Sequence, residues 1–91
     1  MRYEKVYVEV IVKFISDGGM RPLEMVWTGG ERFSIDRVKY IDNIPSKVGS
    51  LSSRRFTVII NGLEKHLYFE ELKERWFVEK RLDCERFCTV T

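Results

Sequence analysis

The chain has 91 residues, of which 44% are hydrophobic, 13% aromatic and 33% charged, and its formal net charge is +2. The 2 Trp, 4 Tyr and 6 Phe exclude a disordered chain, and the 6 Gly and 2 Pro exclude a collagenous or low-complexity one. No apolar stretch approaches the ~20 residues of a membrane-spanning helix, so we expect one small soluble domain without a membrane segment.

The first predicted element is a strand over residues 4–15, in which the even positions from residue 6 to residue 14 are all apolar. We expect these positions to face the core: Val6, Val8, Val10, Val12 and Phe14. Asp17-Gly18-Gly19 then predicts a turn, because glycine adopts left-handed conformations at little cost. Pro22 opens a second strand, whose predicted inward positions are Leu23, Met25 and Trp27.

Gly29-Gly30 predicts a tight hairpin into a third strand over residues 32–41. The inward positions of this strand are Phe33 and Ile35 and then, after a slip in the apolar pattern, Val38 and Tyr40. The slip predicts a β-bulge at Asp36-Arg37 that redirects the strand. A small barrel needs such a bend in order to close.

A serine-rich loop over residues 42–53 leads to a fourth strand that presents Phe56, Val58 and Ile60 on one face. Asn61-Gly62 predicts a type I′ turn into a fifth strand through Leu67 and Phe69. Residues 70–76 combine helix-forming and strand-forming residues. We expect a turn or a single helical turn at 71–75, a sixth strand at 76–80, and a weakly specified tail at 81–91.

These elements predict an all-β domain over residues 1–80, built as a strongly curved meander or a partly closed SH3-like barrel of five to six strands. An OB-like barrel is the second candidate. The phase of the strands predicts six largely buried residues: Val8, Val10, Trp27, Ile35, Val58 and Ile60.

No residues form a catalytic pattern. The single histidine, His66, has no nucleophile or acid in a recognisable motif beside it, and Cys84 and Cys88 with one histidine fall short of a four-ligand zinc site. We therefore expect no enzymatic activity, no metal and no cofactor. Two closely spaced cysteines cannot staple a domain, and the chain begins without a signal-peptide pattern, so we expect free thiols in a reducing cytoplasm.

The distribution of charge is the feature with functional content. Residues 32–55 hold six basic and two acidic residues and so carry a net charge of +4. The candidate binding residues are Arg32, Arg37, Lys39, Tyr40, Lys47, Arg54 and Arg55. Four of them, Lys39, Lys47, Arg54 and Arg55, are expected to converge at one end of the barrel. Cations beside aromatic residues are typical of single-stranded nucleic-acid sites, and the alternative is a polar loop flanked by solubilising charges.

The chain resembles small bacterial single-domain β proteins that carry a Pro-x-x-φ-x-Trp-x-Gly hairpin. The segments that carry the resemblance are Pro22–Gly29, Phe33–Val38, Arg55–Val58 and Trp76–Glu79. The resemblance implies a β-barrel and a bacterial cytoplasmic location, and it implies no catalytic residue.

Two function classes follow. The first is a non-enzymatic protein-interaction or accessory module, which would bind a protein partner through a sheet edge, the long loop or the tail. The alternative is a barrel that binds single-stranded DNA or RNA through residues 32–55. The geometry of the cations discriminates between them, because a nucleic-acid site requires them to line one face beside an exposed Tyr40.

Overall fold

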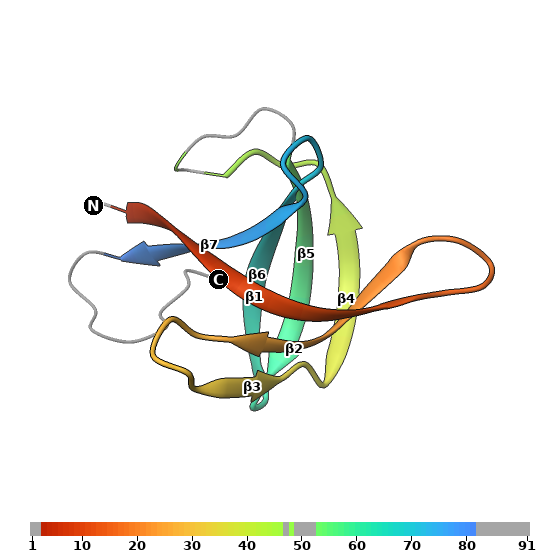
Figure 1. Cartoon of the computed structure of the whole chain (residues 1–91), viewed down its shortest axis with the longest axis horizontal. Coiled ribbons are helices and arrows are strands. Elements are labelled where there is room, and N and C mark those ends of the chain that lie inside the picture. The colour runs from red at the N-terminus through yellow and green to blue at the C-terminus, as the bar shows by residue number, and fades with distance from the viewer. Residues whose placement is uncertain (1–2, 47, 49–52, 82–91) are drawn as a thin grey trace.

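The computed structural model describes residues 3–46, 48 and 53–81, which form antiparallel strands and contain no helix (Figure 1). The strands are β1 (Tyr3–Phe14), β2 (Met20–Val26), β3 (Arg32–Ser34), β4 (Arg37–Asp42), β5 (Ser53–Ile60), β6 (Leu63–Glu70) and β7 (Arg75–Arg81). They form one seven-stranded sheet in the order β3-β2-β1-β7-β6-β5-β4. The predicted all-β class is therefore confirmed. The described residues include no helix that is long and apolar enough to cross a membrane.

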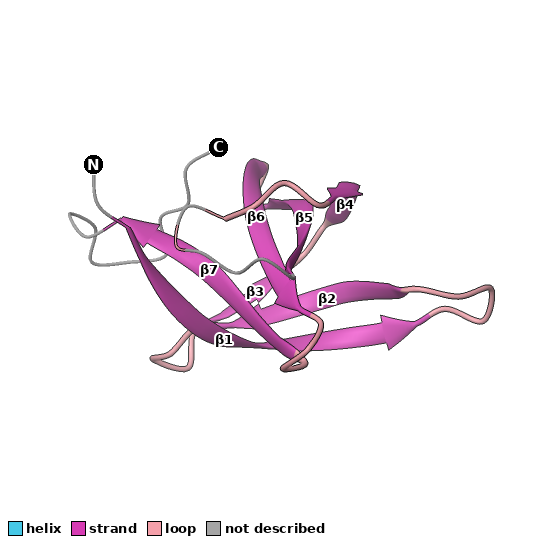
Figure 2. Ribbon diagram, turned by 90° about the horizontal axis from the view of Figure 1, so that it is seen from above, coloured by secondary structure: helices cyan, strands magenta, loops and turns pink. Residues whose placement is uncertain are grey.

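The sheet curls because β3 and β4 are neighbours in the chain but lie at its opposite ends (Figure 2). Only Ile35 and Asp36 separate these strands. The Ile35 N–H donates to the Leu23 carbonyl at 2.9 Å, and the Asp36 N–H donates to the Ile59 carbonyl at 2.8 Å. This two-residue link draws the two ends of the sheet together into a half-barrel. The predicted third strand is thus two strands, which raises the count to seven.

The long strand β1 belongs to both parts of the half-barrel. Its first half, residues 3–8, pairs with β7, and its second half, residues 9–14, pairs with β2. The β1–β2 hairpin therefore extends beyond the rest of the sheet (Figure 1). Phe14 lies at its end and is 78% exposed, so the prediction that it faces the core is wrong. The sheet does not continue far enough to cover it.

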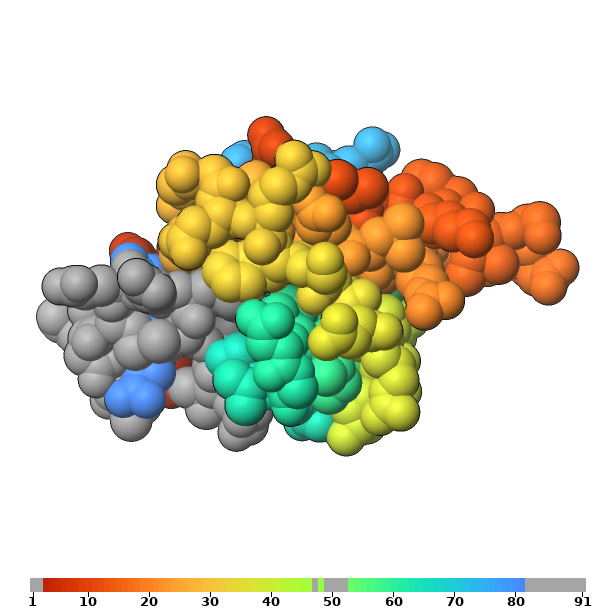
Figure 3. All heavy atoms as spheres, turned by 90° about the horizontal axis from the view of Figure 1, so that it is seen from below, coloured from red at the N-terminus to blue at the C-terminus, as the bar shows by residue number. Residues whose placement is uncertain are grey.

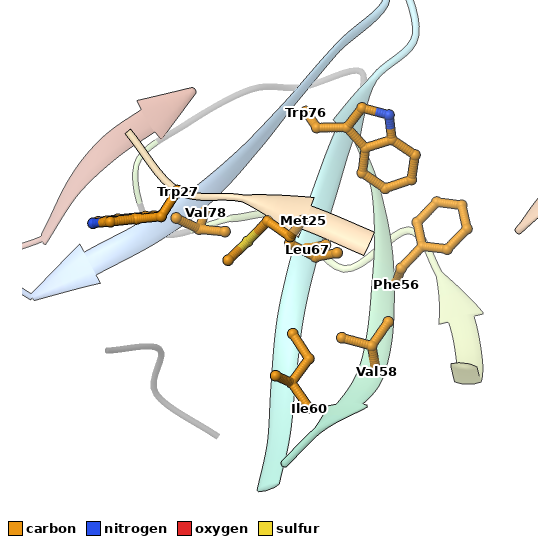
Figure 4. Packing of buried hydrophobic residues seen from close by; sticks show 8 residues of the cluster. All are labelled: Met25, Trp27, Phe56, Val58, Ile60, Leu67, Trp76 and Val78. Atoms are coloured by element: carbon orange, nitrogen blue, oxygen red, sulfur yellow. The ribbon is translucent and has the colours of Figure 1, made fainter. Parts of the chain in front are cut away.

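The core lies inside the curl and is formed by residues of the three strands β5, β6 and β7 and of the end of β2 (Figure 4). Its buried members are Met25, Trp27, Phe56, Val58, Ile60, Leu67, Trp76 and Val78. The Phe56 and Trp76 rings pack with their centroids 4.9 Å apart. Of the six predicted core residues, Trp27, Val58 and Ile60 are buried, and Val8, Val10 and Ile35 are partly buried against this cluster.

Two bulges shift side chains away from their predicted faces. Ile11 pairs with Glu24 and Val12 with Pro22, so Leu23 has no partner in the ladder and is 40% exposed, while Pro22 is fully buried. On β4, the bulge falls between Val38 and Tyr40, after the predicted position at Asp36-Arg37. Tyr40 consequently turns away from the core and is 51% exposed.

The predicted turns lie where the sequence places them. Asn61 and Gly62 join β5 to β6 with φ angles of 53° and 77°, as a type I′ turn requires. Of the two alternatives predicted for residues 71–75, the structure has the turn, at residues 71–74, and not the single helical turn. Strand β7 begins immediately after it. Residues 82–91 of the predicted tail, with Cys84 and Cys88, lie outside the described residues.

Candidate interaction surface

The predicted basic residues do not all lie on one face of the sheet. Arg54 and Arg55 are consecutive on β5, so their side chains leave opposite faces of the sheet. Arg54 lies opposite Phe69 and pairs with Glu71 at 2.8 Å, whereas Arg55 lies opposite Tyr68. Arg55 donates two hydrogen bonds to Asp42, at 2.8 Å and 3.0 Å. The alternation of a strand therefore separates two residues that are adjacent in the sequence.

The other predicted cations are also engaged with acids or lie elsewhere. Lys39 on β4 pairs with Glu64 at 2.8 Å, and Arg32 on β3 pairs with Glu24. Lys47 is outside the described residues. Lys39, Arg54 and Arg55 are thus each paired with a different acid, and Arg54 and Arg55 lie on opposite faces of the sheet.

These pairs shift the pKa values of their members. The hydrogen bond from Arg55 lowers the pKa of Asp42 below its ordinary value, against the opposing effect of burial. The hydrogen bond to Glu64 raises the pKa of Lys39 in the same way. Both acids remain ionised at neutral pH and neutralise the cations beside them.

The face of the sheet opposite the core carries a buried aromatic and polar cluster. The Tyr68 and Phe77 rings stack with centroids 5.0 Å apart, and the Tyr68 hydroxyl donates to Glu79 at 3.2 Å. Lys5 pairs with Glu70 at 3.0 Å. Burial lowers the pKa of Lys5, but the hydrogen bond and charge of Glu70 outweigh it and raise that pKa. Glu79 thus accepts a hydrogen bond from Tyr68, and one oxygen of Glu70 accepts a hydrogen bond from Lys5, inside the fold.

His66 lies on β6 at the margin of this cluster. Burial, followed by the charge of Arg55, lowers its pKa. No group of three or more metal-ligating side chains occurs among the described residues. The part of the chain that the structure describes therefore holds no cluster of side chains that could bind a metal ion.

A groove lies where the two ends of the curled sheet face each other. It has a volume of about 350 Å³ and is lined by Ile15, Met20, Arg21, Arg37, Val38 and Ile41. We call it the seam groove. Its two walls are the β1–β2 hairpin and β4, which lie next to each other on the face in Figure 3.

The seam groove combines apolar side chains with an unpaired strand edge. β4 is the last strand of the sheet, so its backbone groups that point away from β5 meet no strand among the described residues. Ile15 and Ile41 are 42% and 46% exposed. Neither Arg21 nor Arg37 forms an ion pair with a described residue, unlike the paired cations elsewhere on the sheet.

A second groove of about 610 Å³ lies at the mouth of the half-barrel, where Phe14, Phe69 and Trp76 meet charged residues. Arg54 and Glu71 line it and neutralise each other. It therefore lacks the combination of unpaired backbone and unpaired cations that the seam groove has.

Sequence reasoning found Arg37 but missed the rest of the seam groove. The hairpin residues Ile15, Met20 and Arg21 reach β4 only because the sheet curls through the link at residues 35–36. One local signal was present, since Ile15 is an apolar residue directly before a turn, where polar residues are usual.

Comparisons with protein-family models, with curated proteins and with solved structures find no match to this chain.

Proposed function

We propose that this domain is a non-enzymatic protein-interaction module that binds an extended segment of a partner protein along β4. The observation that carries the proposal is the seam groove, in which a strand edge that no described strand pairs with lies beside exposed apolar side chains. Extended peptides commonly bind by adding a strand to such an edge, with affinity from the backbone and specificity from alternate side chains.

The dimensions of β4 define the length of the bound segment. β4 has six residues, which span about 20 Å at the usual rise of a strand. Val38 and Ile41 are available to contact alternate side chains of the segment. On the opposite wall, Pro22 lacks an N–H and is a poor ladder partner. The segment therefore hydrogen-bonds to β4 and contacts the hairpin through side chains.

Nucleic-acid binding through residues 32–55 has less support. Tyr40 is exposed, as that alternative requires, but Arg32, Lys39, Arg54 and Arg55 are held in ion pairs on two faces of the sheet. Phosphate contacts would have to break these pairs.

We also propose a bacterial cytoplasmic location. Two cysteines separated by three residues close too small a loop to stabilise a secreted domain, which supports a reducing compartment. The resemblance of the Pro22–Gly29 hairpin to bacterial proteins supports the source.

The test of the function is a binding titration with a defined peptide. The probe is a six-residue peptide of alternating Val and Gln, blocked at both ends and N-methylated along one edge so that it cannot self-associate. We expect this peptide to bind and to protect β4 amides from hydrogen exchange. The same peptide methylated at every residue is expected not to bind, because it has no edge left to pair.

Two variants locate the site. Ile41→Ser removes an exposed apolar side chain from the groove and is expected to weaken binding by about five- to tenfold. Leu72→Ser makes a comparable change at an 86% exposed residue in the β6–β7 turn and is expected to leave binding unchanged. Equal binding of the two methylated peptides, or equal effects of the two variants, would contradict strand addition at β4.

A further inference from the structure

We infer that the segment bound in the seam groove alternates apolar and acidic residues, and that Arg21 and Arg37 recognise its carboxylates. This inference rests on the proposed function and adds the chemistry of the partner. It follows from three observations: the faces on which the groove residues lie, the lack of an ion pair between the groove arginines and any described acid, and a like-charge pair on the hairpin.

On both walls of the seam groove, apolar side chains on the inner side alternate with an arginine on the outer side. Met20 and Val38 pack against the core, and Ile41 lies opposite the core residue Phe56, so these side chains line the inner side of the groove. Arg21 and Arg37 each lie one residue away from an inner position on the same strand, and therefore on the outer side. A strand laid along β4 would meet apolar groups inside and guanidinium groups outside.

The two arginines differ from most cations of the sheet in their surroundings. Six other cations form ion pairs with acids within the fold: Lys5, Arg32, Lys39, Arg54, Arg55 and Lys80. Arg21 and Arg37 line the groove together, and no acidic residue is among its lining residues. Asp36 precedes Arg37 in the chain but forms no ion pair with it. The groove therefore holds positive charge that the described residues leave uncompensated.

The hairpin adds to this charge at an unfavourable position. Lys13 lies directly opposite Arg21 in the β1–β2 ladder, so both cations lie on one face of the hairpin. Like charges at directly opposed positions destabilise a strand pair. A carboxylate placed beside Arg21 would relieve this repulsion.

The mixture of charge and apolar surface favours a polypeptide over a phosphate backbone. A guanidinium group binds a carboxylate through two parallel hydrogen bonds, and the adjoining apolar side chains exclude water from the pair. Met20, Val38 and Ile41 give a phosphate backbone no polar partner. An extended peptide satisfies both sides of the groove, because its successive side chains point in opposite directions.

The experiment compares three blocked six-residue peptides, each N-methylated along one edge, in which Val alternates with Glu, Gln or Lys. We expect the Glu peptide to bind about tenfold more tightly than the Gln peptide, and the Lys peptide to bind least. The preference for Glu is expected to shrink as salt is raised, because the ion pairs are partly exposed.

Arg21→Gln and Arg37→Gln should each reduce the preference for Glu, and the double variant should abolish it while the Gln peptide still binds. Lys73→Gln is the matched control, since Lys73 is an exposed cation in the β6–β7 turn, and it should leave the preference unchanged. Unfolding curves of all variants, monitored by tryptophan fluorescence, show whether each remains folded.

The possible failures are distinguishable. Equal affinity for the Glu and Gln peptides would overturn the acidic segment and leave strand addition intact. A preference for Glu that survives in the double variant would place recognition of the acid elsewhere and overturn the role of the two arginines. If no peptide binds, both the inference and the proposed function fail. Displacement of the Glu peptide by a six-nucleotide oligothymidine would overturn the inference in favour of a nucleic-acid site.

Discussion

Ile60 shows how the alternation of a strand determines the contribution of a single residue to the free energy of unfolding. It is 3% exposed within the core cluster, and the preceding residue, Ile59, points to the other face of β5. Ile60→Ala should reduce the free energy of unfolding by about 2–4 kcal/mol, through lost burial and the cavity left behind. Urea unfolding measures this loss. Ile59→Ala should cost clearly less, and equal losses at the two positions would reverse the assigned phase of β5.

The side chain of Thr57 lowers the free energy of unfolding, and the sequence around it does not reveal this effect. It is fully buried on β5, and its hydroxyl has no hydrogen-bond partner. A buried hydroxyl without a partner destabilises the fold by about 1–3 kcal/mol. Thr57→Val should therefore raise the free energy of unfolding by about 1 kcal/mol. A lower free energy of unfolding for this variant would show that the hydroxyl is satisfied.

His66 should make stability depend on pH. Its pKa is lowered in the fold, mainly by burial, so the unfolded chain binds a proton more readily than the folded one. The free energy of unfolding should therefore fall as pH drops below about 6.5, the ordinary pKa of histidine. Since the chain has one histidine, His66→Gln should flatten urea unfolding midpoints between about pH 7.5 and about pH 5. An unchanged pH dependence in this variant would assign the effect to another group.

At the scale of elements, the β5–β6 hairpin depends on backbone conformation more than on space. Gly62 has a φ of 77°, whereas Gly29 does not have a positive φ, and a Cβ atom at either residue would meet nothing within 4 Å. Gly62→Val should cost about 1–3 kcal/mol of unfolding free energy because of this left-handed conformation. Gly29→Val should cost much less. Similar losses from both variants, measured by urea unfolding, would contradict the conformational explanation.

The same turn shows which elements local sequence predicts and which it does not. The dipeptide Asn61-Gly62 favours a type I′ turn independently of its tertiary surroundings, so the β5–β6 hairpin was predictable. The break at residues 35–36 and the bulge near Lys39 depend on closure of the sheet. The slip of the apolar pattern indicated a bend, but it could not indicate that β3 and β4 pair at opposite ends. The outward orientation of the Tyr40 side chain depends on this bulge, so the sequence pattern could not predict it.

For the whole molecule, closure of the sheet determines which residues meet. Sequence proximity grouped the cations of residues 32–55, yet the curl distributes the described ones over three strands and both faces. It also places Arg37 in the same groove as Arg21, which lies sixteen positions earlier in the chain. The candidate site was therefore predictable only in part, because its second wall comes from a hairpin that local patterns do not connect to β4.

This distribution of charge predicts weak binding to nucleic acid. Counterion release requires cations that reach phosphates, and Arg54 and Arg55 are held by Glu71 and Asp42 on opposite faces. We expect no detectable binding of a fluorescent single-stranded oligonucleotide at about 50 mM salt, where phosphate contacts are strong. A site with three or four phosphate contacts would instead give a log–log salt slope of about −2 to −3. Such a slope, reduced by about one unit or more when Arg54 and Arg55 are both replaced by Ala in a variant that remains folded, would show that the ion pairs open for phosphate. It would then favour the nucleic-acid function over strand addition at β4.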